Sequence, residues 1–155
     1  MIIEAAAWDD PDVRRLTTDQ QTEIRARYGG KEEPGRPPSA ADVSVVLVAR
    51  DDDGTALGCG ALRELGDGVA EVKRMYVAPV ARGRGVSRSV LAGLEAGARA
   101  RGWFVLRLET GPLQPEAVGL YTGAGYRPIG AFGSYAGDPD AAGSLFFEKV
   151  LDAGC

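Results

Sequence analysis

The feature that most constrains the fold is a change in the spacing of apolar residues near residue 80. Three apolar runs, at residues 43–49, 57–65 and 69–77, are separated by short turn sequences, as is typical of antiparallel strands. From residue 86 to 101 the apolar residues repeat at helical spacing, and residues 103–109 return to a strand pattern. A strand, a helix and a strand in succession require a parallel crossover. We therefore expect an α/β fold with a mixed, mainly antiparallel, twisted sheet flanked by helices.

The flanking segments add further elements. Asp10-Pro11 is typical of an N-cap followed by a first-turn proline, and the helix that begins there should end at Gly29-Gly30. Residues 31–41 contain three prolines and predict a loop. Three more elements are predicted downstream, namely a helix over residues 115–122 and strands over 126–131 and 145–151. No internal repeat interrupts this pattern, so we expect a single domain over residues 1–155.

The composition excludes several kinds of chemistry. The 155 residues include no histidine, which excludes Ser-His-Asp and Cys-His catalysis and imidazole metal ligation, and we expect no metal site. The 18 basic and 22 acidic residues give a net charge of −4. This balance gives no bulk electrostatic support for binding to nucleic acid or to a membrane surface, so we expect neither partner.

Cysteine content and the N-terminal sequence point to a location. The two cysteines, Cys59 and Cys155, are too few for a disulfide framework. No run of 18 apolar residues occurs, and the start, Met1 to Glu4, lacks the basic segment of a signal peptide. We therefore expect a cytoplasmic protein. Cys59 lies between two glycines on a predicted strand, where we expect a small buried residue and not a nucleophile.

The densest chemical signal lies between a predicted strand and a predicted helix. It is the segment Arg82-Gly83-Arg84-Gly85-Val86-Ser87-Arg88. Its glycines let the backbone approach a ligand closely, and the first amides of a helix attract an anion. Its arginines add donors suited to phosphate. The segment is neither a P-loop nor a complete dinucleotide-binding motif, because no Gly-Lys-Ser/Thr follows and a third glycine is missing. The alternative is a solvated basic loop that only separates the two elements.

The surrounding motifs resemble a known family. In chain order they are Met75-Tyr76-Val77-Ala78-Pro79, Arg82-x-x-Gly85-x-Ser87, Leu106-Arg107-Leu108-Glu109-Thr110 and Ala117-x-x-Leu120-Tyr121-x-x-x-Gly125-Tyr126. Together they resemble the GNAT superfamily of acetyl-CoA-dependent N-acyltransferases, over about residues 43–151. In that family a loop of this pattern holds the pyrophosphate of coenzyme A through backbone amides, and the preceding strand pairs with the pantetheine arm. The resemblance implies a single GNAT-like domain that uses acetyl-CoA as co-substrate.

The resemblance assigns cofactor-binding roles to the matching positions. The pyrophosphate is expected at Arg82, Gly83, Arg84, Gly85, Val86 and Ser87, with Arg88 adding charge, and the pantetheine at Met75, Tyr76 and Val77. Two positions depart from the family pattern. Ser87 replaces the usual Gly or Ala and adds a hydroxyl that can donate to phosphate. Gln114 stands where many members have an asparagine that contacts the coenzyme, which weakens that contact without removing the loop.

Tyr121 is the expected general acid. The resemblance gives this position the role of protonating the departing thiolate, and a phenol with a pKa near 10 can donate toward a thiolate whose parent thiol has a pKa near 8.5. The alternative is an aromatic ring that packs in the core with its hydroxyl in water.

More than one group is a candidate for the general base. Glu71 lies on the strand before the loop, at a spacing from Arg82 similar to that of the catalytic glutamate in some GNAT branches. A carboxylate is a weak base for an amine, so burial or a water relay would be needed. The alternative is that Glu71 pairs with Lys73, Arg74 or a charge on a neighbouring strand. Glu109, at the end of the following strand, is a second carboxylate candidate.

Acceptor binding is expected outside the shared motifs. Tyr28, Phe132 and Tyr135 lie in glycine-rich segments typical of binding loops, although each could instead be a packed aromatic beside a surface turn. We expect direct acetyl transfer to a primary amine of a small molecule, without a covalent enzyme intermediate. Two alternatives stay open, namely acetylation of a protein or peptide amine and a noncatalytic acyl-CoA sensor or interaction module. GNAT-like domains are often dimers, so a homodimer is one expected assembly.

Overall fold

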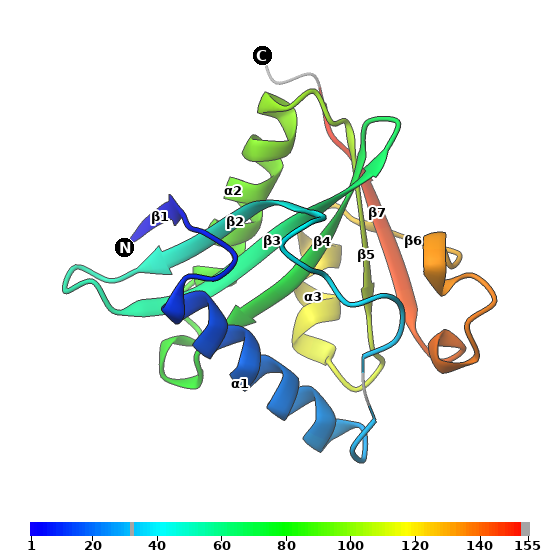
Figure 1. The fold of residues 1–155 in the computed structure, drawn as a ribbon, viewed down its shortest axis with the longest axis horizontal. Coiled ribbons are helices and arrows are strands. Elements are labelled where there is room, and N and C mark those ends of the chain that lie inside the picture. Colours follow the sequence, from blue (N-terminus) through cyan, green and yellow to red (C-terminus); the bar gives the residue numbers. More distant parts are fainter. Residues whose placement is uncertain (32, 153–155) are drawn as a thin grey trace.

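The computed structural model describes residues 1–31 and 33–152. In this part of the chain seven strands form one mixed sheet in the order β1-β2-β3-β4-β5-β7-β6, with α1 on one face and α2 and α3 on the other (Figure 1). The strands are β1 (Ile2–Ala5), β2 (Val43–Arg50), β3 (Ala56–Gly66), β4 (Val69–Val77), β5 (Val105–Thr110), β6 (Arg127–Ile129) and β7 (Leu145–Val150), and the α-helices are α1 (Pro11–Arg27), α2 (Val86–Ala100) and α3 (Pro115–Gly123). Cys155 lies outside the described residues.

The predicted α/β fold with a mixed, mainly antiparallel sheet is confirmed. β4 pairs with β5 in parallel, and the other neighbouring strands pair antiparallel. Asp10 caps α1 as predicted, because its carboxylate accepts from the backbone amides of Asp12 and Val13. β5 begins at Val105, two residues later than predicted. The reason is that the amide of Trp103 is used to close α2, where it donates to the carbonyl of Ala98.

The parallel pairing of β4 and β5 is short. Only Val69 to Glu71 pair with β5, opposite Val105 to Arg107. Beyond Glu71 the remainder of β4 has β3 as its strand neighbour on one side and no paired strand on the other. The two strands therefore leave room between them toward the end of β4, and this end precedes the glycine-rich segment and α2.

A bulge in β4 falls within this unpaired segment. Cys59 pairs with Tyr76 but Ala61 pairs with Lys73, so two residues of β4, Arg74 and Met75, face the single residue Gly60 of β3. Arg74 has φ 57°, in the left-handed region. A non-glycine residue in that region is strained by about 1–3 kcal/mol and is often found where a strand re-aims its side chains at a site.

The core has a layer on each face of the sheet. The amphipathic helix α2 buries Val90, Leu91 and Leu94 against the sheet and α3. On the opposite face Val13 and Leu16 of α1 pack on β2 and β3. Cys59 is in this second layer, and burial raises the pKa of its thiol to about 12, which confirms the expectation of a buried residue and makes it a poor nucleophile. No helix of the described residues is long and apolar enough to cross a membrane.

Close packing of β3 against β4 generates a stability prediction. A Cβ at Gly58 would lie 2.7 Å from the carbonyl oxygen of Tyr76, whereas a Cβ at Gly119, inside α3, would have nothing within 4 Å. We expect Gly58→Ala to lower the free energy of unfolding by about 1–3 kcal/mol. Gly119→Ala should raise it by about 0.5–1 kcal/mol because alanine loses less conformational freedom in a helix. Urea denaturation of both variants checks this, and equal effects would contradict the packing.

Candidate active site

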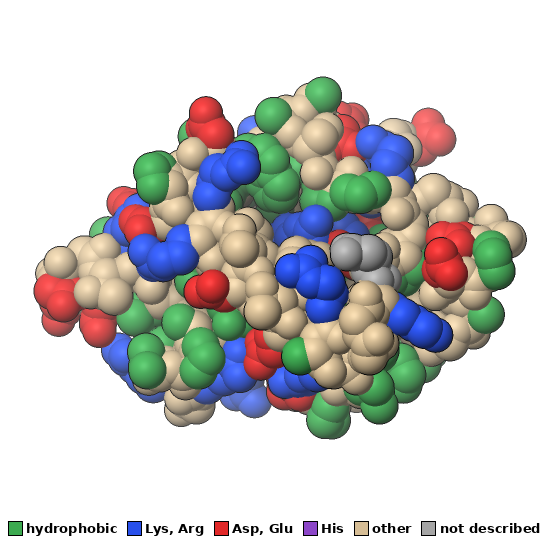
Figure 2. Space-filling view, turned by 60° about the horizontal axis from the view of Figure 1, so that its bottom comes forward, with side chains coloured by type: hydrophobic (Ala, Val, Ile, Leu, Met, Phe, Trp, Pro, Cys, Tyr) green, Lys and Arg blue, Asp and Glu red, His purple; other side chains and the backbone are tan. Residues whose placement is uncertain are grey.

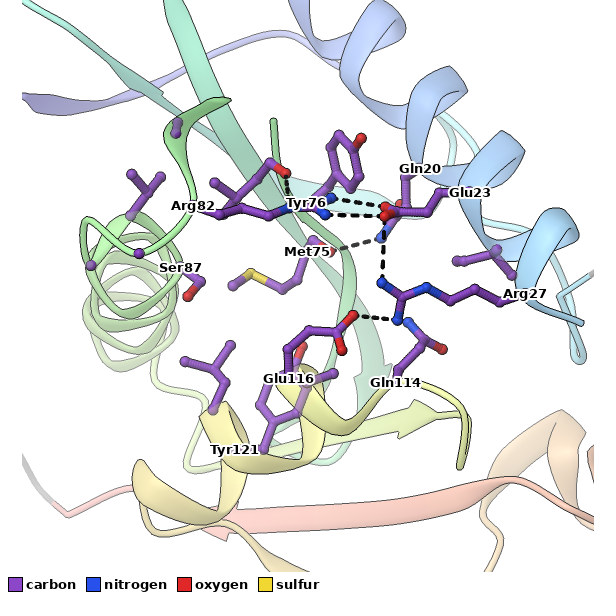
Figure 3. Close-up of a pocket in the computed structure, with 18 residues that line it drawn as sticks. Gln20, Glu23, Arg27, Met75, Tyr76, Arg82, Ser87, Gln114, Glu116 and Tyr121 are labelled. Atoms are coloured by element: carbon purple, nitrogen blue, oxygen red, sulfur yellow. Dashed lines mark hydrogen bonds and ion pairs between the residues drawn. The ribbon is translucent and has the colours of Figure 1, made fainter. Parts of the chain in front are cut away.

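A cavity of about 240 Å³ lies where β4 is not paired with β5. Its walls come from four parts of the chain, namely the C-terminal half of α1, the end of β4, the glycine-rich segment with the start of α2, and α3. Figure 2 shows a hollow near the middle of the face that carries α1, with hydrophobic side chains in it and Lys and Arg side chains around it. Figure 3 shows the labelled side chains coming from these four parts around the cavity, with the Tyr76 ring directed away from its centre beside Arg82.

The glycine-rich segment presents a backbone suited to an anion. Gly83 and Gly85 line the cavity with φ of 80° and 79°, and a Cβ at either would meet nothing within 4 Å. Gly85 is the N-cap of α2 and offers no side chain to the first amides of the helix. These amides are therefore available to an external acceptor, and the helix dipole favours a negative one. Ser87, on the first turn of α2, also lines the cavity.

The arginines of this segment are placed differently from the sequence prediction. Arg82 lines the cavity, but its guanidinium donates to Glu23 of α1 and to the carbonyl of Val77 and stacks over the Tyr76 ring. Arg84 is not among the lining residues and pairs with Asp51 at 3.3 Å on the surface. Arg88 is exposed and also lies outside the lining. In this structure the backbone and Ser87, more than these guanidinium groups, face the cavity.

The end of β4 forms the opposite wall, where Met75, Tyr76 and Val77, the residues expected to contact pantetheine, all line the cavity. Gln20 of α1 reaches across and donates its Nε2 to the carbonyl oxygen of Met75 at 2.8 Å. The Oε1 of Gln20 is buried and has no hydrogen-bond partner among the described residues. A buried amide oxygen without a donor costs about 1–3 kcal/mol, so the site holds an acceptor position that a ligand N–H could satisfy.

A chain of ion pairs crosses the cavity wall from the glycine-rich segment to α3 (Figure 3). Arg82 donates to both carboxylate oxygens of Glu23, at 3.1 and 2.9 Å, and Arg27 donates to Glu23 at 3.4 Å and to Glu116 of α3. The hydrogen bonds from Arg82 lower the pKa of Glu23 against the opposing effect of burial.

Sequence reasoning missed these α1 residues. Their only signal was the spacing of Gln20, Glu23, Ile24 and Arg27, which places them on one helix face.

Tyr121 of α3 lines the cavity and is 5% exposed. Its ring packs edge-on against Tyr126 with centroids 5.6 Å apart. Its hydroxyl makes no hydrogen bond with any residue that the structure describes, which leaves its proton available to a group in the cavity. Burial, with a further effect of the Glu109 charge, raises the pKa of Tyr121, so the phenol stays protonated at neutral pH.

Glu109, at the end of β5, has the electrostatics of a base. Burial raises the pKa of its carboxyl group to about 7, against the opposing effects of a hydrogen bond with Ser144 and of the Lys73 charge, and the charges of Glu33 and Glu71 raise it further. The Glu109 charge also raises the pKa values of Tyr121 and of Tyr28 at the end of α1. Glu109, like Glu71, does not line the cavity, but its charge acts on the cavity tyrosine, and near neutral pH it exists in both protonation states.

Glu71 has a different environment from that expected of a catalytic base. It is 1% exposed and does not line the cavity. Its Oε1 accepts from Arg63 of β3 at 2.8 and 3.2 Å, and its Oε2 accepts from the hydroxyl of Tyr135 at 2.6 Å. This placement favours the alternative that Glu71 pairs with a charge on a neighbouring strand, because both of its oxygens are already used.

The other predicted contacts divide between the cavity and the core. Gln114 lines the cavity, where its Oε1 accepts from the amide of Gly111 and the hydroxyl of Tyr28. Tyr28 lies outside the lining and joins α1 to the β5–α3 loop, accepting also from the amide of Leu113. Phe132 and Tyr135 are 8% and 2% exposed and pack with Phe146. Their large rings prefer that apolar cluster to the loop surface, so neither aromatic reaches the cavity.

Comparisons with known proteins agree with this architecture. A family model described as the acetyltransferase (GNAT) domain matches residues 42–128. The chain is 46% identical to the IAA acetyltransferase of Azospirillum brasilense over 106 residues, which are 68% of this chain and 67% of that protein. A solved structure from Klebsiella pneumoniae subsp. pneumoniae MGH 78578, provisionally named an acyl-CoA N-acyltransferase, is 36% identical with a TM-score of 0.81 over 97% of each chain.

A more distant structure shares the fold. It is the GNAT superfamily phosphinothricin acetyltransferase of Sinorhizobium meliloti, solved in complex with AcCoA, with 20% identity and a TM-score of 0.69 over 99% of this chain and 89% of that one. The family model alone covers more than half of this chain, and the mixed, mainly antiparallel sheet is the one expected from the sequence. The chain belongs to the GNAT family of acetyltransferases.

Proposed function

We propose that the protein transfers an acetyl group from acetyl-CoA to a primary amine of a small-molecule acceptor, by direct attack and without a covalent enzyme intermediate. One observation carries this proposal. A single cavity joins the free amides at the start of α2 to the phenol of Tyr121 along the unpaired end of β4. An anion-binding end and a proton donor in one cavity are what aminolysis of a coenzyme A thioester needs.

The residues present fit coenzyme A. The open space over Gly83 and Gly85 would admit a pyrophosphate group to the amides of residues 85–88, with Ser87 adding a hydroxyl donor. The edge of β4 at Met75 to Val77, which no strand pairs on this side, would lie along the pantetheine arm. The carbonyls of Met75 and Val77 already accept from Gln20 and Arg82, and the unsatisfied Oε1 of Gln20 can accept from an N–H group of the arm. The structure of the Sinorhizobium protein with AcCoA supports this assignment.

The side chains that move protons are Tyr121 and Glu109. Bound acetyl-CoA supplies an activated carbonyl carbon. As the amine nitrogen bonds to that carbon and the C–S bond breaks, the phenol of Tyr121 donates toward the departing thiolate. The nitrogen must lose one proton, and we assign this proton to Glu109 in place of Glu71, directly or through a water. Glu109 has a carboxyl poised near neutrality, whereas Glu71 is held by Arg63 and Tyr135.

The location, the assembly and the alternative functions stay proposals. We infer a cytoplasmic location from the low cysteine content, and a homodimer stays a prediction. The name of the Azospirillum relative, IAA acetyltransferase, favours a small acceptor over a protein or peptide amine. The presence of Tyr121 in the cavity favours an enzyme over a sensor.

A thiol-release assay with acetyl-CoA and a panel of primary amines tests the function. The expected result is release above the hydrolysis background with some small amines. Lysine-containing and N-terminal peptides in the same panel test the alternative acceptor class. If acetyl-CoA binds but no amine or peptide accelerates release, the sensor function replaces the proposed one.

The anion end of the cavity is tested by Ser87→Asp. A carboxylate on the first turn of α2 should weaken acetyl-CoA binding at least about tenfold, equal to about 1.4 kcal/mol. The same charge is favourable at a helix N-terminus by about 0.3–1 kcal/mol, so the thermal stability should be unchanged or raised. Calorimetric titration and thermal melts check this. Ser89→Asp is the matched control, because Ser89 does not line the cavity, and equal loss of affinity in both variants would contradict the assignment.

The general acid is tested by Tyr121→Phe. Removal of the hydroxyl should lower kcat about 100-fold with little change in acetyl-CoA affinity, since the ring that lines the cavity remains. The control is Tyr126→Phe, because the Tyr126 hydroxyl donates to Glu95 at 2.9 Å outside the cavity. That control should lose stability and keep kcat. Steady-state kinetics of the two variants decide, and an unchanged kcat in Tyr121→Phe would exclude the role.

The base is tested by the pH dependence of the rate. Glu109 must be ionised to accept a proton, so kcat should rise with pH through a midpoint near 7 and level off above it, because burial raises the pKa of this carboxyl to about 7. Glu109→Gln should lower kcat and remove this rise of kcat with pH. Glu71→Gln should destabilise the fold and keep the rise. A pH dependence lost in Glu71→Gln and kept in Glu109→Gln would reverse the assignment.

A further inference from the structure

A second cavity lies along a different face of α1 from the cavity that we assign to acetyl-CoA. It has a volume of about 310 Å³ and is lined by Trp8, by five residues of α1 and by Arg74 of β4. None of these residues lines the first cavity. The second cavity is large enough for a small molecule, and a ligand there would not compete with acetyl-CoA for any lining residue.

The α1 residues of this lining lie on one side of the helix. Arg14, Gln21 and Arg25 follow one another at intervals of seven and four residues, with Thr17 and Thr18 between them. This spacing repeats along one face of an α-helix. The residues of α1 that line the first cavity lie on another face of the same helix, so α1 separates the two cavities.

Arg74 reaches the second cavity because of the bulge in β4. Val72 packs in the core layer under α2, and strict alternation along the strand would point Arg74 to the same side. The bulge opposite Gly60 adds one residue to β4, and Arg74 has φ 57°. Met75 then packs on the α2 side, and Arg74 lines the cavity on the α1 side. The irregularity thus brings a cation to this cavity.

The lining is rich in hydrogen-bond donors and contains no carboxylate. It includes three arginines, and none of the described residues that form it is acidic. The side-chain nitrogen of Gln21 is buried without an acceptor among the described residues. The guanidinium of Arg14 and the indole N–H of Trp8 also make no hydrogen bond within the described part of the chain. Donors that lack acceptors favour a ligand group that accepts hydrogen bonds and carries no donors of its own.

The charges of the lining favour an anion. Arg14 makes no ion pair with any residue that the structure describes. Arg74 pairs with Glu33, but Glu33 also accepts from Lys73 at 2.9 Å, so two cations share this carboxylate. The N–H groups of a guanidinium match two oxygens of a phosphate or a carboxylate. Cations gathered in this way attract an anion locally, even in a protein whose net charge is −4.

Trp8 gives the cavity an aromatic wall. It is partly buried and packs against the core layer under α1, and it also lines the cavity. The packing holds the ring in place, so that it presents a flat apolar surface next to the guanidinium groups. A ligand with a ring beside its anionic group would use both kinds of contact.

We propose that the second cavity is a binding site for a small aromatic molecule that carries a phosphate or carboxylate group. The oxyanion would lie among Arg14, Gln21 and Arg74, and the ring against Trp8. The site is separate from the acetyl-CoA cavity and does not depend on the proposed acetyl transfer.

Calorimetric titration of phenyl phosphate and benzoate tests the site, with benzamide as the uncharged control ligand. At least one of the two anions should bind saturably at one equivalent, at least tenfold more tightly than benzamide, and the tighter of the two identifies the preferred oxyanion. The affinity should be the same in Ser87→Asp, which blocks the anion end of the first cavity. An affinity lost in Ser87→Asp would place the anion in the first cavity and overturn the proposal.

Two variants of the lining complete the test. Arg14→Gln removes an exposed charge and should weaken binding at least fivefold. Gln21→Glu adds a carboxylate to the lining and should weaken it at least tenfold. The matched control is Arg15→Gln, because Arg15 lies outside the lining and pairs with Asp12, and its affinity should equal that of the parent. Absence of saturable binding, equal affinity for benzamide, affinity retained in Arg14→Gln or Gln21→Glu, or an equal loss in Arg15→Gln would overturn the proposal.

Discussion

The functional part of the molecule depends on the early separation of two parallel strands. β4 and β5 pair over three residues each, and the rest of β4 then has no partner on that side. The bulge at Arg74 falls in this unpaired part of β4. The carbonyls of Met75 and Val77 accept from the side chains of Gln20 and Arg82 in place of a neighbouring strand, which leaves this edge of the sheet open to a ligand. The cavity, the anion-suited helix start and the tyrosine of α3 are all arranged around this opening.

The absence of histidine shifts acid and base work to groups whose environment must change their pKa values. Burial does this for Glu109 and Tyr121, raising the pKa of the first toward neutrality and keeping the second protonated. Most other buried charges are paired, as in Arg63 with Glu71. On this contrast between the two carboxylates rests our proposal that Glu109, and not Glu71, accepts the proton, although both glutamates lie on neighbouring strands.

Sequence reasoning was reliable where a pattern is local. The period change near residue 80 and the glycines at 83 and 85 predicted β4, α2 and the loop between them, because helical spacing and left-handed turns are properties of short segments. Contacts between distant segments were not predictable in this way. The spacing of Glu71 could not show that Arg63 and Tyr135 use both of its oxygens. The glycines around Phe132 suggested a binding loop, but its ring packs against Tyr135 and Phe146.

We propose above all that the opening between β4 and β5 binds acetyl-CoA. The most direct measurement is amide hydrogen exchange of the protein with and without acetyl-CoA, resolved by residue. We expect increased protection at residues 75–77 and 85–88, which border the cavity, and little change in the β2–β3 turn at residues 51–55. Binding that protects neither 75–77 nor 85–88, or that protects mainly the lining of the cavity bordered by Trp8, Arg14 and Arg74, would exclude acetyl-CoA from this opening.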